Sequence, residues 1–234
     1  MKRFWLLFIA TMILLTGCMN DEQKTDSSNE QPEEKAKVEE KDEAERVRKK
    51  QDTFIESPQA PDDRKLTEVG KTYRDQDGVI KLLAIYSEDK QISVGPMEVT
   101  VKEAKLLNYS PSHDLVDYFH GYTHQETNFN YVKLRVVVEN TSDESLNFAP
   151  VSHLITNTGE QKSFEDDFYL EKLNGAYEPG EKRFGQLGFI LENIKAENLS
   201  FIEIKTSDVF KNKESIHKGE KYTIKMKKTA MNSQ

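Results

Sequence analysis

The stretch Val132-Lys133-Leu134-Arg135-Val136-Val137-Val138-Glu139 decides the class of the fold. Successive side chains of a β-strand point to opposite faces, so Val132, Leu134, Val136 and Val138 share one face, and Lys133, Arg135 and Glu139 share the other. An apolar face opposite a charged face predicts a half-buried strand, with its apolar side chains in a core and its charged side chains toward solvent.

The same alternation recurs before and after this stretch. It places Leu187, Phe189 and Leu191 on one face of a second strand, and Tyr222, Ile224 and Met226 on one face of a third. In an earlier segment Met97, Val99 and Val101 alternate, but the apolar phase then shifts to Ala104 and Leu106, as a β-bulge near Glu103 would cause. Shorter candidate strands are residues 80–86, 146–148, 153–156 and 199–205.

Turn-forming residues separate these candidate strands. They lie at Asp77-Gly78, residues 140–144, residues 157–159, residues 178–181 and Lys218-Gly219. Short strands with this punctuation favour an antiparallel sandwich or barrel. No alternation of strands with long helices is visible, which argues against a parallel sheet. We therefore expect an all-β fold.

The N-terminus has the three parts of a bacterial export signal. Lys2 and Arg3 are followed by the apolar run 4–14, which is shorter than the ~20 residues of a spanning helix and so argues against an uncleaved membrane anchor. The tetrad Leu15-Thr16-Gly17-Cys18 resembles the bacterial lipobox. That resemblance implies a signal peptide over residues 1–17, cleaved between Gly17 and Cys18, and a diacylglycerol on the Cys18 thiol, with or without a further N-acyl lipid.

Cys18 is the one cysteine of the chain, so no intramolecular disulfide can form. Two or three acyl chains hold a protein stably, since each buried methylene contributes ~0.8 kcal/mol. We expect the mature protein to be anchored at the extracytoplasmic face of the cell membrane. The net charge of -8 argues against nucleic acid as a partner, because binding to phosphates needs clustered Lys and Arg.

Composition divides the rest of the chain into a tether and a domain. Residues 18–65 are rich in Glu, Lys, Asp, Gln and Ser, with Pro32, Pro58 and Pro61 as breakers, and predict a charged tether that is partly helical, over residues 33–51, or disordered. The folded β domain is expected over residues 66–230.

Several of these segments together resemble a known family. They are the strand and Asn-rich turn of residues 132–144, the glycine turn of residues 156–160, and the Pro-Gly turn of residues 177–182 that leads into Leu187-Gly188-Phe189. This order resembles the telokin-like, immunoglobulin-fold lipoproteins of Gram-positive bacteria, known as domain of unknown function 4352. The resemblance covers residues 70–228. It implies an immunoglobulin-like β-sandwich outside the membrane, and it supplies no catalytic residues and no cofactor.

An insert between Leu107 and Tyr131 distinguishes this chain from the shortest members of that family. It contains His113, Asp117, His120 and His124, whose imidazole and carboxylate groups are ligands that zinc or manganese accept. Gly121 weakens the helix that would place His120 and His124 on one face. The favoured interpretation is instead a surface loop with a short helix, in which Leu115, Tyr118 and Phe119 pack on the rim of the sandwich and the histidines are solvated.

No catalytic signature is found in the sequence. It contains no G-x-S-x-G elbow, no H-E-x-x-H, no phosphate-cradling glycine loop and no second cysteine, and the acidic run 165–167 predicts a solvated turn rather than a calcium loop. We therefore expect a lipoprotein that is not an enzyme and whose domain binds a protein or cell-envelope partner. The alternative is a lipoprotein that binds a metal or small ligand with the His-rich insert 108–130.

Overall fold

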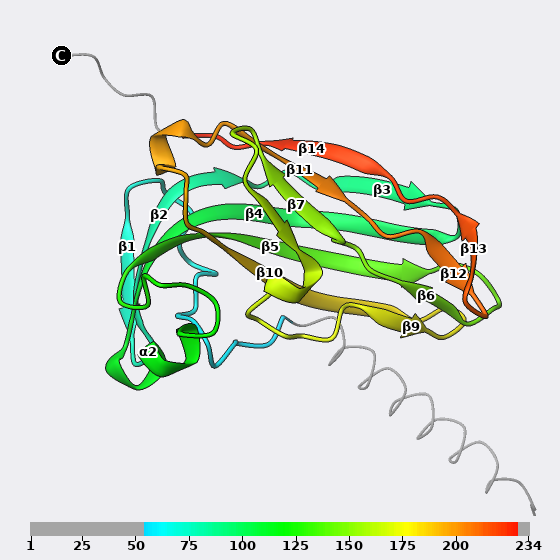
Figure 1. Cartoon of the computed structure of the whole chain (residues 1–234), viewed down its shortest axis with the longest axis horizontal. Coiled ribbons are helices and arrows are strands. Elements are labelled where there is room, and N and C mark those ends of the chain that lie inside the picture. The colour runs from blue at the N-terminus through cyan, green and yellow to red at the C-terminus, as the bar shows by residue number, and fades with distance from the viewer. Residues whose placement is uncertain (1–53, 229–234) are drawn as a thin grey trace, which may run out of the picture. The chain divides into compact units, whose positions relative to one another are not determined.

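The computed structural model describes residues 54–228. The signal peptide, Cys18 and most of the expected tether lie outside the described residues. The first layer of the domain is a six-stranded antiparallel sheet with the order β1-β2-β4-β5-β10, in which β3 also pairs with β4 (Figure 1). Its strands are β1 (Thr72–Asp75), β2 (Gly78–Tyr86), β3 (Lys90–Val94), β4 (Met97–Pro111), β5 (Phe129–Asn140) and β10 (Lys182–Leu191).

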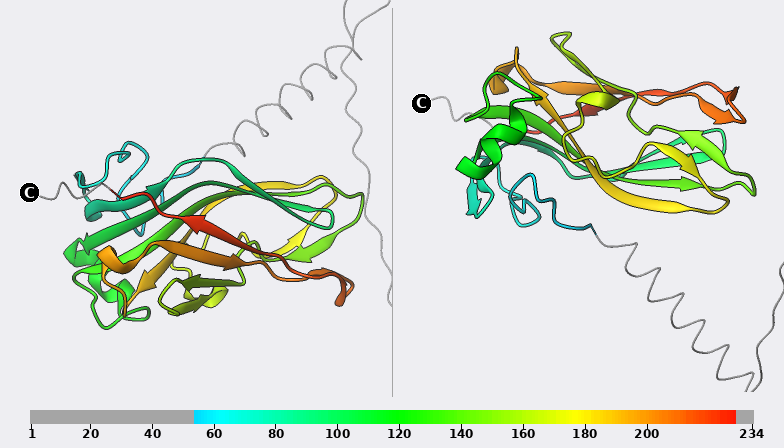
Figure 2. Two further views of the ribbon diagram at one scale, coloured as in Figure 1. Left: turned by 90° about the horizontal axis from the view of Figure 1, so that it is seen from above. Right: turned by 60° about the horizontal axis from the view of Figure 1, so that its bottom comes forward.

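Two four-stranded antiparallel sheets lie on one side of the first layer (Figure 2). One has the order β14-β11-β7-β8 and consists of β14 (Lys221–Lys225), β11 (Phe201–Lys205), β7 (His153–Thr156) and β8 (Gln161–Ser163). The other has the order β13-β12-β6-β9 and consists of β13 (Glu214–His217), β12 (Val209–Lys211), β6 (Leu146–Phe148) and β9 (Gly175–Tyr177). The antiparallel β-sandwich expected from the sequence is confirmed.

Helices are few and short. They are α2 (His113–Phe119) and the 3-10 turns η1 (Phe164–Asp166) and η2 (Ala196–Asn198). None of the helices within the described residues has the length and apolar character that crossing a membrane requires.

The main core fills the space between the two layers. The inner face of β5 contributes Val132, Leu134, Val136 and Val138, which lie opposite apolar side chains of the second layer such as Ile202 and Ile204. These are the residues that the alternation of the sequence assigned to a core, and each buried side chain of this size contributes roughly 1.5–3 kcal/mol. The expected β-bulge is also present, as a shift in the pairing of β4 with β5 between Val101 and Glu103.

The outer face of the six-stranded sheet is also buried, which corrects the expectation of a half-buried strand. A second cluster of buried residues lies on this face and includes Leu107, Tyr109 and Tyr131. The segment 54–66, which we call the N-terminal strap, covers this face together with α2 and the loop 167–174. The charged side chain of Lys133 therefore lies under a cover instead of in solvent.

The N-terminal strap also corrects the expected end of the tether at residue 65. Ala60 and Asp63 are buried, and the hydroxyl of Tyr109 donates a hydrogen bond of 3.1 Å to the carbonyl of Gln59. These residues belong to the folded domain, which therefore includes the chain from Phe54 onward. The sequence of the strap does not indicate that it belongs to the domain, because its composition is polar and the side chains that it contacts are far away in the sequence.

Candidate functional site

The structure does not assemble the metal site considered from the sequence. His113, Asp117, His120 and His124 are all exposed, and among residues 54–228 no group of three or more His, Cys, Asp or Glu side chains is placed to hold a metal ion. The reason is local, since α2 ends at Phe119, so that His120 and His124 do not continue one helical face. His120 instead places Nδ1 2.8 Å from a carboxylate oxygen of Glu126.

The insert packs as the favoured interpretation of the sequence predicts. Phe119 is completely buried, and its ring makes edge contacts with Tyr109 and Phe168 at centroid distances of 5.5 and 5.3 Å. The hydroxyl of Tyr118 donates a hydrogen bond of 2.6 Å to the carbonyl of Phe168. The helix α2 therefore closes one end of the outer cluster, while the histidines stay at the surface.

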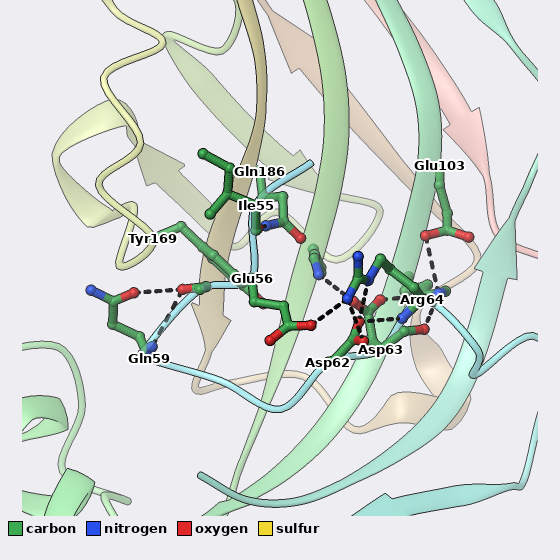
Figure 3. A network of polar contacts seen from close by, with 12 residues as sticks. Ile55, Glu56, Gln59, Asp62, Asp63, Arg64, Glu103, Tyr169 and Gln186 are labelled. Carbon is green, nitrogen blue, oxygen red and sulfur yellow. Dashed lines mark hydrogen bonds and ion pairs between the residues drawn. The ribbon is translucent and has the colours of Figure 1, made fainter. Parts of the chain in front are cut away.

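A buried cluster of charges lies beneath the N-terminal strap (Figure 3). Lys105 of β4 and Lys133 of β5 are direct cross-strand partners, with relative exposures of 1% and 4%. Two like charges in this position repel each other, so the pair needs a counter-ion. Asp63 of the strap supplies it, with a relative exposure of 2%.

Asp63 is hydrogen-bonded to both lysines. Lys133 Nζ donates to Oδ1, while Lys105 Nζ donates to Oδ2 at 3.0 Å and to the Asp63 carbonyl at 2.8 Å. Lys105 Nζ also lies 3.0 Å from a carboxylate oxygen of Glu103. The cluster therefore contains two ammonium groups and two carboxylates, and Asp63 joins the strap to two adjacent strands of the sheet.

The pKa shifts follow from this sharing of one carboxylate. Burial of Asp63 opposes its ionisation, but the charges of Lys133 and Lys105 outweigh burial and hold the pKa of Asp63 below its ordinary value. Burial lowers the pKa of Lys133, because Asp63, which also serves Lys105, compensates only part of the desolvation. The pKa of Asp63 thus lies below its ordinary value, and the pKa of Lys133 lies below that of an exposed lysine.

The ring of Tyr169 packs against the cluster, with Lys133 Nζ 5.2 Å from its centroid. Gly188 is the cross-strand partner of Lys133 on β10, and a Cβ atom there would lie 2.5 Å from the Tyr169 ring. Glycine at this position therefore creates the space that Tyr169 occupies.

Asp167 fixes the start of the loop that carries Tyr169. Its Oδ1 accepts hydrogen bonds from the backbone N–H groups of Gly188, at 2.7 Å, and Tyr169, at 3.1 Å. Burial raises the pKa of Asp167 to about 6, although these hydrogen bonds favour its charged form. The expectation that residues 165–167 form a solvated turn is therefore wrong for Asp167, because its carboxylate turns inward to satisfy backbone donors.

A groove of about 880 Å³ lies beside the charge cluster, between the strap and the loop after Asp167. Ile55 and Leu170 contribute large apolar side chains to it, with relative exposures of 75% and 57%. Among the charged side chains along the groove are Glu56, Lys172, Glu181, Lys182 and Arg183.

The loop that forms one wall of the groove holds an unusual backbone conformation. Leu170 and Lys172 have φ angles of 57° and 53°, in the left-handed region that residues other than glycine seldom adopt. Two contacts hold the loop in place. Glu171 accepts hydrogen bonds from the backbone N–H and the side-chain amide of Gln186, at 2.7 and 2.9 Å, and Arg183 donates one of 3.2 Å to the Lys172 carbonyl. The exposed side chain of Leu170 is therefore presented on a fixed backbone.

Comparison with known proteins identifies the family. A family model described as a domain of unknown function, DUF4352, matches residues 86–215, which is more than half of the chain. The chain belongs to the DUF4352 family. It is 39% identical over 188 residues to "Uncharacterized protein YdhF" of Bacillus subtilis (strain 168), an alignment that covers 74% of this chain and 79% of that protein.

A solved structure also resembles this DUF4352 protein. It is described as the crystal structure of a functionally unknown protein from Listeria monocytogenes EGD-e, with a TM-score of 0.47 and 12% sequence identity, and the match covers 64% of this chain and 89% of that one. The resemblance to the family that the strand and turn pattern indicated is thus confirmed by the family match.

The family match and the charge cluster overlap only in part. Residues 86–215 include Glu103, Lys105 and Lys133, but Asp63 precedes them. The charge cluster of this DUF4352 protein could not be inferred from the sequence, because Asp63 and Lys133 are 70 residues apart. The sequence nevertheless contains an indication that this face is covered. Leu107, Tyr109 and Tyr131 are large apolar or aromatic residues on the face of the two strands that was expected to be in solvent.

Proposed function

We propose that this DUF4352 protein is a lipoprotein, anchored by a diacylglycerol on Cys18 at the extracytoplasmic face of the cell membrane. We further propose that its sandwich is a non-catalytic module that binds a protein or cell-envelope partner in the groove between the strap and the loop 169–174. The observation that carries the binding proposal is the exposure of Ile55 and Leu170 on opposite walls of that groove.

Physical reasons support the groove as a binding surface. Large apolar side chains that are exposed together lose contact with water when a partner covers them, which favours association. Both walls are fixed before binding, since Asp63 holds the strap and Glu171 holds the loop. A preformed surface loses little conformational entropy when it binds, so more of the contact energy contributes to affinity.

The anchor supports the same proposal. The Leu15-Thr16-Gly17-Cys18 tetrad follows a short apolar run and supplies the thiol for the lipid. To test it, the full-length chain and a Cys18→Ala variant are expressed in a Gram-positive host with an alkyne-labelled fatty acid. We expect label and membrane association for the original chain and neither for the variant. Equal label in both chains would refute lipid attachment at Cys18.

The binding proposal is tested by photo-crosslinking in living cells. A photoreactive amino acid is placed at Leu170 or at Ile55 of the full-length lipidated chain, and at Ile216 as a control. Ile216 is 41% exposed on β13 and does not line the groove. We expect the same crosslinked partner from the first two positions and not from Ile216. The proposal fails if the three positions give the same products, or if no position gives a specific product.

A Leu170→Asp variant adds a test of affinity. Leu170 is more than half exposed, so the substitution adds charge to the groove without removing a core side chain. We expect the crosslink from Ile55 to be lost while the melting temperature changes little. An unchanged crosslink would place the partner elsewhere on the domain.

A further inference from the structure

The amine of Lys133 and the carboxyl group of Asp63 are in direct contact on the covered face of the sheet. We propose that they condense after folding, so that an amide bond from Lys133 Nζ to Asp63 Cγ joins the N-terminal strap covalently to β5. This inference does not depend on the proposed lipid anchor or on the groove as a binding site.

The surroundings of the two groups favour reaction with each other over reaction with water. Only 5% of the Lys133 side chain and 3% of the Asp63 side chain are exposed. The space left among Phe54, Asp63, Lys133 and Tyr169 is about 10 Å³, which is at the lower limit for a single water molecule. Two reactants held together in this way react as if one were present at an effective concentration on the order of 10⁵–10⁸ M.

The condensation needs no reagent from outside the cluster. Lys133 Nζ first passes a proton along its hydrogen bond to Asp63 Oδ1, which leaves a neutral amine and a neutral carboxylic acid. The amine lone pair then attacks Asp63 Cγ, and negative charge develops on Oδ2. A second proton moves from Nζ to Oδ1, the bond from Cγ to Oδ1 breaks, and Oδ1 departs as water. The products are one amide and one water, and no atom is oxidised or reduced.

Lys105 is placed to stabilise the intermediate of this step. Its ammonium group donates to Oδ2 at 3.0 Å, which is the oxygen on which the negative charge develops. A preorganised positive donor at that position lowers the barrier, as in other acyl-transfer sites. Glu103, whose carboxylate lies 3.0 Å from Lys105 Nζ, is a positioning residue that holds this ammonium group beside Asp63 Oδ2.

The contacts also decide which lysine is the nucleophile. Lys105 Nζ has three acceptors, which are the backbone carbonyl oxygen of Asp63, Oδ2 of Asp63 and a carboxylate oxygen of Glu103. Within residues 54–228, Lys133 Nζ has a hydrogen bond only to Asp63 Oδ1. Lys133 therefore has fewer partners that hold its proton, and its amine is the one that becomes free to attack.

Peptide mapping of the full-length protein tests the proposal directly. Trypsin cannot cleave after a lysine whose amine is in an amide, so residues 106–135 would remain one peptide, joined to the peptide of residues 51–64 that contains Asp63. We expect a branched product whose mass is the sum of the two peptides minus one water. Recovery of unmodified peptides 51–64 and 106–133 in full yield would overturn the proposal.

Substitutions test the assignment without relying on stability. Lys133→Arg keeps the positive charge but removes the nucleophile, so the variant should give the separate peptides. Asp63→Asn should give the same branched peptide as the original chain, with ammonia released in place of water. A branched peptide that persists in Lys133→Arg, or a branch at Lys105 in the original chain, would overturn the assignment of Lys133.

Discussion

Replacing Asp63 by alanine is expected to destabilise the domain strongly. The substitution leaves Lys105 and Lys133 as directly opposed, buried ammonium groups without their shared counter-ion. At a separation of about 5 Å and an effective dielectric constant of about 20, their repulsion is about 3 kcal/mol. Removal of one partner from a buried ion pair costs about 3–5 kcal/mol, which agrees with this figure.

The measurement is the free energy of unfolding from urea titration, together with the melting temperature. For a chain of this size each kcal/mol corresponds to roughly 2–4 °C, so Asp63→Ala should lower the melting temperature by roughly 6–20 °C. The Asp63→Ala variant also cannot form the proposed amide bond to Lys133. Without this cross-link the unfolded chain has more conformational entropy, which lowers the free energy of unfolding by about 4 kcal/mol more for a loop of this length.

Asp62→Ala is the matched control. Asp62 is adjacent in the sequence and also pairs with a basic side chain, since Arg64 Nε lies 2.7 Å from its Oδ1. That pair is partly exposed, so we expect a loss of no more than about 1 kcal/mol. Equal unfolding free energies for Asp63→Ala and Asp62→Ala would refute the reasoning, because they would show that burial of the charge cluster contributes nothing to stability.

Three other substitutions are expected to have the following effects. Asp167→Asn keeps an oxygen acceptor but removes a carboxyl group whose pKa is raised to about 6 in the folded state. Such a carboxyl group stabilises the folded protein below its unfolded pKa and loses that contribution as the pH rises through 6. In urea titrations the variant should therefore be more stable than the original chain at pH 7, by about 3 kcal/mol at most, and the difference should vanish near pH 4. Gly188→Ala places a Cβ 2.5 Å from the Tyr169 ring and should cost about 1–3 kcal/mol, whereas Gly121→Ala meets no atom within 4 Å and should melt close to the original chain; the reverse order would contradict the packing described. Zinc or manganese should leave the melting temperature unchanged both in the original chain and after His120→Ala with His124→Ala, and a shift of several degrees that the double substitution abolishes would show that the insert binds metal after all.

The strands were predictable because their signal is local. The alternation of apolar and polar residues assigned the inner face of β5 correctly, and it located the bulge near Glu103 from a change of phase between Val101 and Ala104. Each of these inferences uses residues within about ten positions of one another, where backbone geometry alone relates sequence to orientation.

The outer face and the candidate site were not predictable in this way. Whether Lys133 faces solvent depends on the strap, whose relevant residue, Asp63, is separated from it by 70 positions. The strap has the polar composition of a tether, so composition placed residues 54–65 outside the domain. Long-range pairing of this kind leaves no periodic pattern in a single sequence, and the same holds for the groove that the strap forms with Leu170.

The bulge between Val101 and Glu103 makes the whole outer arrangement sensitive to the length of the chain. Lys102 is the additional residue in β4, and it reverses the orientation of every residue that follows. Met97, Val99 and Val101 therefore face the second layer, while Lys105, Leu107 and Tyr109 face the strap. Loss of a single codon at position 102 would remove the bulge and leave these orientations unchanged, whereas insertion of a single codon between positions 103 and 105 would turn Lys105 into the sandwich interior and Leu106 outward. Among DUF4352 genes, such an insertion should therefore be tolerated only in members that have lost the strap and its carboxylate together.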